Sequence, residues 1–578
     1  MLQGWLQIAV FLAVTFACVP LLGGYMARVF TGQRVFLSPV LGPIERLTYK
    51  VLRVDADTSQ DWKGYAGTLI VFSALFWLAL YAILRTQGIQ PWNPQNFHSG
   101  TWDVSFNTAS SFVTNTNWQF YGGETTMSNF SQMAGLAVQN FVSAGVGIAV
   151  AIVLIRAIAS RRAGESAGVG NFWVDLTRAL LYVLLPIAFV VALVLVSQGV
   201  LQTLGHFTDF TGIAGQKGTI ATGPVASQEA IKMLGTNGGG FFNVNSAMPF
   251  ENPTQFSNWV EMWAMLVIPA SLTYTYGRMV GSRRQGWAVF SAMAILLIVS
   301  TVVIYLAEAH GSPAQHLAGL TGGNMEGKEQ RFGIANSSLF AALTTAMSCG
   351  AVNAAMESLT GIGSLVPFVN MGYSESVFGG VGAGMYTMLL YVLLAVFIGG
   401  LMVGRTPEFL GKKIEAREIK LVSLAVIFTP LVVLVFTALA LATRYGGPSI
   451  YNGGPQGFGE TLYAYLSQAN NNGSAFAGYT GYVQPEPGNL GAFGITFADL
   501  MGAFAMLFAR FVPIILVIGI AGTLVRKRVA PPGLGTLRTD TPTFVGMNVF
   551  VVVLIGALTF FPALLLGPVV QGLTDQLF

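Results

Sequence analysis

Ten long apolar stretches divide the 578-residue chain, and they restrict its fold more than any other feature. A helix crosses the hydrocarbon core of a bilayer with about 20 mostly apolar residues, and each stretch is long enough. Only 9% of the residues are charged, against roughly 25% in a soluble protein. The sequence therefore predicts an all-α polytopic membrane protein with about ten transmembrane helices, at residues 3–23, 65–85, 131–155, 176–200, 256–277, 286–308, 378–403, 421–443, 497–524 and 544–568.

The basic residues indicate which way these helices run. Of the 29 Lys and Arg residues, 22 lie in the five connections that follow the first, third, fifth, seventh and ninth stretches. Basic connections stay in the cytoplasm, so this alternation predicts a multi-pass protein with both termini outside. No Lys or Arg precedes Arg28, whereas a cleavable signal peptide begins with a charged region. The first stretch is therefore predicted to be a retained span.

Several other classes of function are disfavoured by the composition. The net charge of +4 is spread over the whole chain without a concentrated basic face, which argues against nucleic-acid binding. Cys18 and Cys349 offer neither a disulfide framework nor metal-ligand spacing. The four histidines are scattered over outward connections. We expect no metal site other than one for a transported cation.

The outward connections contain twelve acidic residues against six basic ones, including Asp103, Glu229, Glu251, Glu308 and Glu460. An acidic vestibule would concentrate cations at the mouth of a pathway. A solvated outer surface would have the same composition. The sequence leaves both interpretations open.

Four outward connections share one layout, a segment of about ten residues with helical character followed by a cluster of small and amide residues. Taking Thr116, Gly238, Gly350 and Gly473 as equivalent gives separations of 122, 112 and 123 residues. A near-constant period is typical of an internal repeat. It predicts four span–pore loop–span units, at 65–155, 176–277, 286–403 and 421–524, between a first span with its cytoplasmic loop (1–64) and a last span with an outer C-terminus (544–578).

The four clusters have the chemistry of an ion filter. A dehydrated monovalent cation needs a cage of oxygens, which non-helical backbone supplies where it lines a cavity. Glycine permits positive φ, and the C-terminal end of a short helix favours a cation. Because Thr116 replaces glycine, we expect a slightly different geometry in the first loop. The predicted filter comprises Asn115, Thr116, Asn117, Thr236, Asn237, Gly238, Ser348, Cys349, Gly350, Asn471, Asn472 and Gly473.

Several long motifs resemble one known family. They are Thr-Asn-Thr-Asn-Trp-Gln at 114–119, Thr-Asn-Gly-Gly-Gly-Phe-Phe-Asn at 236–243 with Phe-Glu-Asn-Pro at 250–253, Ser-Cys-Gly-Ala at 348–351, and Gly-Arg-Thr-Pro-Glu at 404–408 with Leu-Gly-Lys-Lys at 410–413. Over essentially its whole length the chain resembles the potassium-binding A subunits of the Kdp potassium-transporting ATPases. The resemblance implies a fold similar to the Trk/Ktr/HKT potassium transporters, with potassium as the transported ion.

The same resemblance implies partners and a location. It implies a complex with a P-type ATPase B subunit, a C subunit and a small F subunit in the bacterial inner membrane. It also implies that potassium enters from the periplasm, passes the filter and leaves sideways through an intramembrane tunnel into the B subunit. Membrane lipid surrounds such a chain, and we expect no nucleic-acid partner.

The residues themselves indicate that this chain does not hydrolyse ATP. It contains no Gly-x-x-x-x-Gly-Lys-Ser/Thr loop and no Asp-Lys-Thr-Gly-Thr motif. The longest cytoplasmic connection, about 24–64, is too short for a nucleotide domain. We therefore expect no bound nucleotide and no enzymatic activity of its own, so the energy for active transport must come from a partner.

Three charged residues are candidates for the ion pathway. Arg510 lies in the middle of the ninth stretch, where a lone charge costs a few kcal/mol or more. It is either a fixed positive charge that limits occupancy of the filter or a member of an ion pair with Glu261, Glu375 or Asp499, and the two roles are compatible. Resemblance suggests that Glu375 lies near the intramembrane route. Arg405 belongs to a basic loop, 404–420, that contacts the B subunit or anionic lipid, or is an ordinary cytoplasmic loop.

The run Gly379-Gly380-Val381-Gly382-Ala383-Gly384 is a weak match to a dinucleotide-binding fingerprint. Because it falls inside a predicted span, we interpret it as a close-packing or unwound helix segment.

Two functions compete. The preferred one is a potassium-selecting subunit of a high-affinity ATP-driven importer, and the alternative is a free-standing Trk-type potassium channel or ion-coupled transporter. A receptor or structural membrane protein would not explain four similar loops. Copurification with a P-type ATPase subunit distinguishes the first two.

Overall fold

The computed structural model describes residues 1–161, 168–402, 404, 406–481, 496–531 and 536–573. Within these residues, nine helical segments are long and apolar enough to cross a membrane. They are α1 (Leu2–Phe30), α3 (Trp62–Arg85), η2–α6 (Ser131–Ala159), α7–η3–α8 (Phe172–Ser197), α11–α12 (Arg283–Leu317), α15 (Ala383–Met402), α16 (Ala416–Ala442), α18 (Phe497–Leu524) and α19–η8–α20 (Pro542–Leu573). The prediction of a polytopic all-α protein is confirmed.

The remaining predicted span, 256–277, is helix α10 (Gln255–Met279). With 25 residues it is about 37 Å long, which is enough to cross a bilayer. It carries polar residues such as Asn258 and Glu261, and these are buried because α10 packs against α1, α9, α11 and α13. This helix therefore has protein rather than lipid on most of its surface, which explains why it is less apolar than the other nine.

Four short helices lie between the long ones and end at the predicted loops. They are α4 (Trp102–Val113), α9 (Val225–Leu234), α13 (Gly333–Ala346) and α17 (Gly454–Ala469). Their C-caps are Thr114, Gly235, Met347 and Asn470, each directly before a predicted filter segment. The four short helices were predicted at these places, whereas the division of the chain into four equivalent units stays a prediction.

The predicted span at 378–403 begins five residues later than expected. Helix α14 (Gly361–Gly372) ends, a loop occupies 373–382, and α15 begins only at Ala383. Backbone φ is positive at Phe378, Gly379 and Gly382, and a Cβ at Gly384 would overlap the carbonyl oxygen of Phe378. Both interpretations of this glycine run are confirmed: the backbone before Ala383 is unwound, and Gly382 and Gly384 pack too closely against neighbouring backbone to admit a Cβ.

The strands are short and lie in connections. β1 (Thr208–Thr211) pairs with β2 (Lys217–Ile220), with Thr208 opposite Ile220, and β3 (Glu408–Phe409) pairs with β4 (Lys412–Lys413). The remaining short elements are α2 (Ser38–Leu52), η1 (Gln87–Ile89), α5 (Gly123–Thr126), η4 (Asn245–Ala247), η5 (Met356–Ser358) and η6 (Gly447–Ser449).

The β3–β4 hairpin holds a buried lysine. Lys412 Nζ donates to the carbonyl oxygens of Ala157 (2.7 Å) and Leu524 (2.8 Å), at the C-terminal ends of α6 and α18. Burial, with a smaller contribution from Lys527, lowers the pKa of Lys412 to about 8. This lysine binds within the protein, so the basic loop 404–420 presents fewer cations to a partner or to lipid than its sequence suggests.

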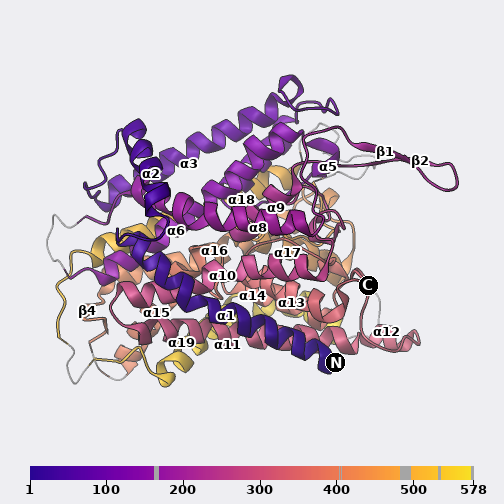
Figure 1. The fold of residues 1–578 in the computed structure, drawn as a ribbon. Helices are drawn as coiled ribbons and strands as arrows, with labels where there is room; N and C mark the ends of the chain where they lie inside the picture. The colour runs from indigo at the N-terminus through magenta and orange to yellow at the C-terminus, as the bar shows by residue number, and fades with distance from the viewer. Residues whose placement is uncertain (162–167, 403, 405, 482–495, 532–535, 574–578) are drawn as a thin grey trace.

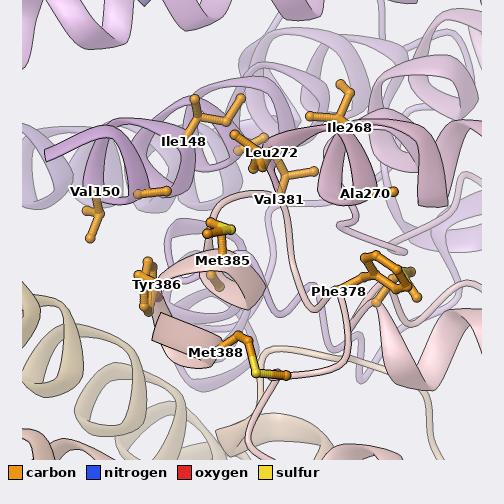
Figure 2. Close-up of a cluster of buried hydrophobic side chains, with 14 of the residues drawn as sticks. Ile148, Val150, Ile268, Ala270, Leu272, Phe378, Val381, Met385, Tyr386 and Met388 are labelled. Atoms are coloured by element: carbon orange, nitrogen blue, oxygen red, sulfur yellow. The ribbon is translucent and has the colours of Figure 1, made fainter. Parts of the chain in front are cut away.

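The long helices run roughly alongside one another (Figure 1). The start of α1 and the end of the described chain lie on one side of the bundle, with α12 and the β1–β2 hairpin, whereas α2 and β4 lie on the opposite side. Figure 2 shows the apolar centre, where Ile148 of α6 and Leu272 of α10 lie beside Val381 of the loop before α15. The start of the chain and the end of its described part, at Leu573, thus lie on the same side of the bundle.

Candidate cation site

The four predicted loops share one backbone conformation. In each loop the first and third residues have positive φ, and the second donates its N–H to a carbonyl oxygen five residues back, on the short helix. The first and third residues are Asn115 and Asn117, Thr236 and Gly238, Ser348 and Gly350, and Asn471 and Gly473. The N–H···O distances are 3.0 Å for Thr116, 2.8 Å for Asn237 and 2.9 Å for both Cys349 and Asn472.

This pattern corrects the predicted alignment of the first loop by one residue. Asn117, with φ of 55°, is the counterpart of Gly238, Gly350 and Gly473, whereas Thr116 corresponds to Asn237, Cys349 and Asn472. The first loop does differ slightly, with φ of 76° at Asn115 against 47–54° at the other first positions, and 55° at Asn117 against 82–96° at the glycines. The expected reason is wrong, because Thr116 does not occupy the glycine position. Asparagine tolerates positive φ better than most residues because its short side chain forms local hydrogen bonds.

The four loops meet in a closed ring, which we call the loop ring (115–117, 236–238, 348–350 and 471–473). A Cβ at Gly238 would overlap the carbonyl oxygen of Cys349, and one at Gly350 would overlap that of Asn472. A Cβ at Gly473 would overlap the carbonyl oxygen of Thr116. The first and second loops are joined by Asn115, whose Nδ2 donates to the carbonyl oxygen of Thr236 (3.0 Å).

The carbonyl oxygens of the loop ring are nearly all without partners. Of these twelve oxygens, only that of Thr236 accepts a hydrogen bond within the described residues. Buried carbonyl groups are otherwise almost always paired, so a buried ring of free oxygens is unusual. A dehydrated cation satisfies such oxygens, and the negative ends of four short helices add to its stabilisation. The predicted filter residues are therefore brought together in a site suited to one cation.

Side chains behind the loop ring hold it in shape. Asn237 Nδ2 donates to Asn115 Oδ1 (2.6 Å), and Asn117 Nδ2 donates to Asn140 Oδ1 (2.6 Å). In the third and fourth loops a side-chain hydroxyl holds the backbone instead. The N–H of Gly350 donates to Thr344 Oγ1, and the N–H of Gly473 donates to Ser467 Oγ, each at 2.9 Å. The strained backbone is thus fixed before any ion binds.

The second loop has a lysine where the third and fourth have these hydroxyls. Lys232 is fully buried and forms ion pairs with Glu229 (2.7 Å) and Glu251. The other carboxylate oxygen of Glu251 accepts from the N–H of Phe242 (3.1 Å), which ties the segment after the loop to α9. Sequence reasoning missed this group, although the spacing Glu229-x-x-Lys232 in a short buried helix was a usable signal.

Five of the outward acidic residues are internal. Asp103, Glu229, Glu251, Glu308 and Glu460 are all buried, and Glu308 pairs with Lys328 (2.7 Å). A solvated surface does not describe these five residues, because charge composition alone does not reveal which carboxylates have buried partners. Asp103 lines an outer cavity of about 760 Å³ together with Asp499, so for this residue the acidic vestibule remains a prediction.

Replacing Lys232 tests its contribution to the second loop. We expect Lys232→Met to lower stability by about 3–5 kcal/mol, because Glu251 and Glu229 would be left buried without a counter-ion. The variant should also weaken cation binding, since Glu251 holds the segment beside Gly238. Thermal unfolding at a series of potassium concentrations measures both effects.

Lys328→Met is the matched control, because Lys328 pairs with buried Glu308 outside the loop ring. It should lower stability without changing the potassium dependence. Equal shifts in potassium dependence for the two variants would show that Lys232 has no specific connection with the cation site.

Arg510 and Glu375 meet next to the loop ring. Arg510 Nη1 lies 3.5 Å from Glu375 Oε2 and 3.4 Å from the hydroxyl of Tyr386, and both charged side chains are buried. A cavity of about 30 Å³ is lined by Glu375 and Tyr386 together with Asn471 of the fourth loop. Of the three acids that the sequence offered as partners for Arg510, the structure places Glu375 against it. Arg405 lies outside the described residues.

The loop at 373–382 also contacts the loop ring. The N–H of Val381 donates to Thr236 Oγ1 (2.8 Å), and a Cβ at Gly382 would overlap the carbonyl oxygen of Gly147 in α6. This loop therefore fills the space between the second filter loop, α6 and α15. It leaves the small cavity beside Arg510 and Glu375 on the side of the fourth loop.

The predicted family resemblance is confirmed by comparison with known proteins. The family model described as the potassium-transporting ATPase A subunit matches residues 9–573. The chain is 54% identical over 572 residues to the potassium-transporting ATPase potassium-binding subunit of Methylobacterium radiotolerans, covering 99% of this chain and 98% of the relative. The subunit of the same name from Mesorhizobium japonicum is 53% identical over 572 residues, with the same coverage.

A solved structure adds a likeness in fold. The potassium transporter TrkH from Vibrio parahaemolyticus matches with a TM-score of 0.51 and 15% sequence identity, over 78% of this chain and 84% of that one. Matching helices at so low an identity indicate a shared fold. The near-complete family match and the relatives at more than half identity show that the chain belongs to the potassium-transporting ATPase A subunit family.

Proposed function

We propose that the chain is the potassium-binding, ion-selecting subunit of a high-affinity ATP-driven potassium import complex. The observation that carries this proposal is the loop ring, a buried set of twelve carbonyl oxygens of which eleven accept no hydrogen bond within the described residues. The names of the relatives from Methylobacterium and Mesorhizobium, which are called potassium-binding subunits of a potassium-transporting ATPase, support the choice of ion.

The geometry of the ring supports selection at a single site. Each loop contributes one turn with free carbonyls, so the four turns surround one cation rather than a row of several. The oxygens are held apart by neighbouring loops and by buried amide side chains, so the cage does not collapse when it is empty. Under this proposal, selectivity arises because a cation of the wrong size loses its water without gaining good contacts from a fixed cage.

The route after the filter is proposed to run sideways. The loop at 373–382, bonded to Thr236, stands between the second filter loop and the rest of the bundle. The small cavity beside Asn471 is instead lined by Glu375, which pairs with Arg510. We propose that Arg510 is a fixed charge that limits how long potassium stays in the filter, and that Glu375 orients Arg510. Arg405 is proposed to take part in coupling potassium transport to ATP hydrolysis.

The partners and the location are proposed from the resemblance to the family. We propose assembly with a P-type ATPase B subunit, a C subunit and a small F subunit in the bacterial inner membrane, with both termini in the periplasm. Four equivalent units at 65–155, 176–277, 286–403 and 421–524 are part of the proposal. The short helices α4, α9, α13 and α17, each followed by the same turn, support it.

A second candidate function is a free-standing potassium channel or ion-coupled transporter, and the likeness in fold to TrkH is the observation in its favour. The two proposals differ in the source of energy. Potassium uptake that needs ATP and is blocked by vanadate belongs to the first alone.

Purification of the chain without any partner tests the division of labour. We expect no measurable ATP hydrolysis, because the sequence contains no phosphorylation or nucleotide-binding motif. The same preparation should still bind potassium. The complex isolated from native membranes is the positive control, and it should hydrolyse ATP in a potassium-stimulated manner. Hydrolysis that persists in the isolated chain would contradict the proposal.

A further inference from the structure

Helix α2 differs from the spanning helices in direction and in surface. It lies at the end of the bundle opposite the chain termini and runs across the direction of α3 (Figure 1). Val40, Ile44, Leu47 and Val51 are spaced as one face of a helix, and each is between 45% and 72% exposed. An exposed apolar stripe on a helix that lies across the spans is typical of a segment embedded at the level of the lipid headgroups.

A cavity of about 480 Å³ lies between α2, the C-terminal end of α1 and the segment α7–η3. On α2 it is lined by the face next to the stripe, which includes Pro43, one turn before Leu47. Three arginines line it: Arg34, Arg46 and Arg178. Within the described residues, neither Arg34 nor Arg46 has an ion-pair partner. The acid in the lining is Glu45, so the cavity has an excess of positive charge.

Glu45 fixes one of these arginines. Its Oε1 accepts from Arg178 Nε (3.0 Å) and from the hydroxyl of Tyr49 (2.8 Å), while Oε2 accepts from the hydroxyl of Tyr182 (2.7 Å). Burial alone would raise the pKa of Glu45, but these hydrogen bonds and the charge of Arg178 together lower it. Both carboxylate oxygens of Glu45 thus already accept hydrogen bonds from neighbouring side chains.

The other end of Arg178 faces the cavity. Its terminal nitrogens have no hydrogen-bond partner within the described residues. They lie close to Gly32, because a Cβ added to Gly32 would be 3.6 Å from Nη1 and 3.8 Å from Nη2 of Arg178. A fixed guanidinium with two free terminal nitrogens, flanked by two arginines without ion-pair partners in the described residues, matches the oxygens of a phosphate group.

We propose that this cavity binds the phosphate headgroup of an anionic membrane phospholipid, whose acyl chains lie along the apolar stripe of α2. The stripe favours a lipid over a soluble phosphate, because Pro43 of the cavity lining and Leu47 of the stripe are one turn apart on α2, so acyl chains can pass from the cavity onto the neighbouring apolar face. The basic connections predict that this end of the protein faces the cytoplasm, where basic pockets next to spanning helices recognise such headgroups. A bound lipid would fasten α2 to η3 and thereby to the second predicted unit.

Native mass spectrometry of the purified chain in detergent tests this proposal. The chain is titrated with phosphatidylglycerol, with phosphatidylcholine and with glycerol phosphate, and the retained adducts are counted. We expect phosphatidylglycerol to be retained at least about tenfold more strongly than phosphatidylcholine. Glycerol phosphate in excess should not displace it.

The double variant Arg34→Gln/Arg46→Gln should weaken retention of phosphatidylglycerol about tenfold or more, because two unpaired charges are removed and the Glu45–Arg178 pair is left intact. The matched control is Arg283→Gln/Arg284→Gln, which removes two exposed arginines outside the cavity. It should leave retention unchanged. Equal retention by both double variants, equal retention of phosphatidylcholine, or displacement by glycerol phosphate would each overturn the proposal.

Discussion

Gly238→Asp is expected to weaken apparent potassium affinity by at least tenfold and to admit other alkali cations. Gly238 has φ of 82°, and any Cβ there would overlap the carbonyl oxygen of Cys349, so the third loop must move away. A tenfold loss corresponds to about 1.4 kcal/mol, which a small displacement of cage oxygens readily produces. The carboxylate adds a charged oxygen that favours cations regardless of size, so selectivity should fall with affinity.

Gly281→Asp is the matched control. Gly281 has φ of 79°, but a Cβ there would meet nothing within 4 Å. It therefore imposes the same backbone strain and the same new charge outside the loop ring. Competition of sodium, rubidium and caesium with potassium, measured for both variants, separates strain from a specific effect on the cage. If the competition curves for Gly238→Asp matched those of the parent chain, the loop ring would not be the selectivity filter.

The second large effect concerns Arg510. Arginine side chains carry a positive charge in proteins, and two unit charges about 8 Å apart repel by about 2 kcal/mol at an effective dielectric of about 20. Removing that repulsion is enough to raise cation occupancy more than tenfold. Arg510→Gln should therefore bind potassium more tightly or in greater number while the assembled complex couples potassium less well to ATP hydrolysis. Arg510→Lys should be intermediate, since it keeps the charge but not the reach toward Glu375.

A double variant distinguishes the fixed charge from a purely structural ion pair. Arg510→Gln leaves Glu375 buried without its partner, a defect that Arg510→Gln/Glu375→Gln removes. If Arg510 serves only the ion pair, the double variant should recover potassium-stimulated ATPase activity. If it limits occupancy, the double variant should assemble normally and stay uncoupled. Potassium-stimulated ATPase activity and ion binding, measured on the same preparations, decide between these outcomes.

Local composition was enough to locate the spans and the loops. Apolar runs identify segments that face lipid, and a period of about 120 residues marks the turns after α4, α9, α13 and α17. It was not enough to align the first loop, because Asn117 adopts the positive φ that glycine adopts in the others. Residue identity suggested Thr116, whereas the hydrogen bond from its N–H to Ser111 gives the register.

The other features that the sequence did not predict arise from contacts between segments that are distant in the sequence. Helix α10 is polar because protein surrounds it, and the pairing of Lys232 with Glu251 joins α9 to the turn before α10. The partner of Arg510 could be narrowed only to three acids, because no sequence pattern states which of them faces α18. The break before α15 was visible in its glycines, but the contact of Val381 with the second filter loop was not.

The most direct measurement is the position of a bound cation in the complex, obtained from the anomalous scattering of rubidium substituted for potassium. A single peak inside the loop ring is expected, in contact with backbone carbonyl oxygens from all four loops and absent from Gly238→Asp. A peak elsewhere, for example in the outer cavity lined by Asp103 and Asp499, with the loop ring empty, would contradict the account.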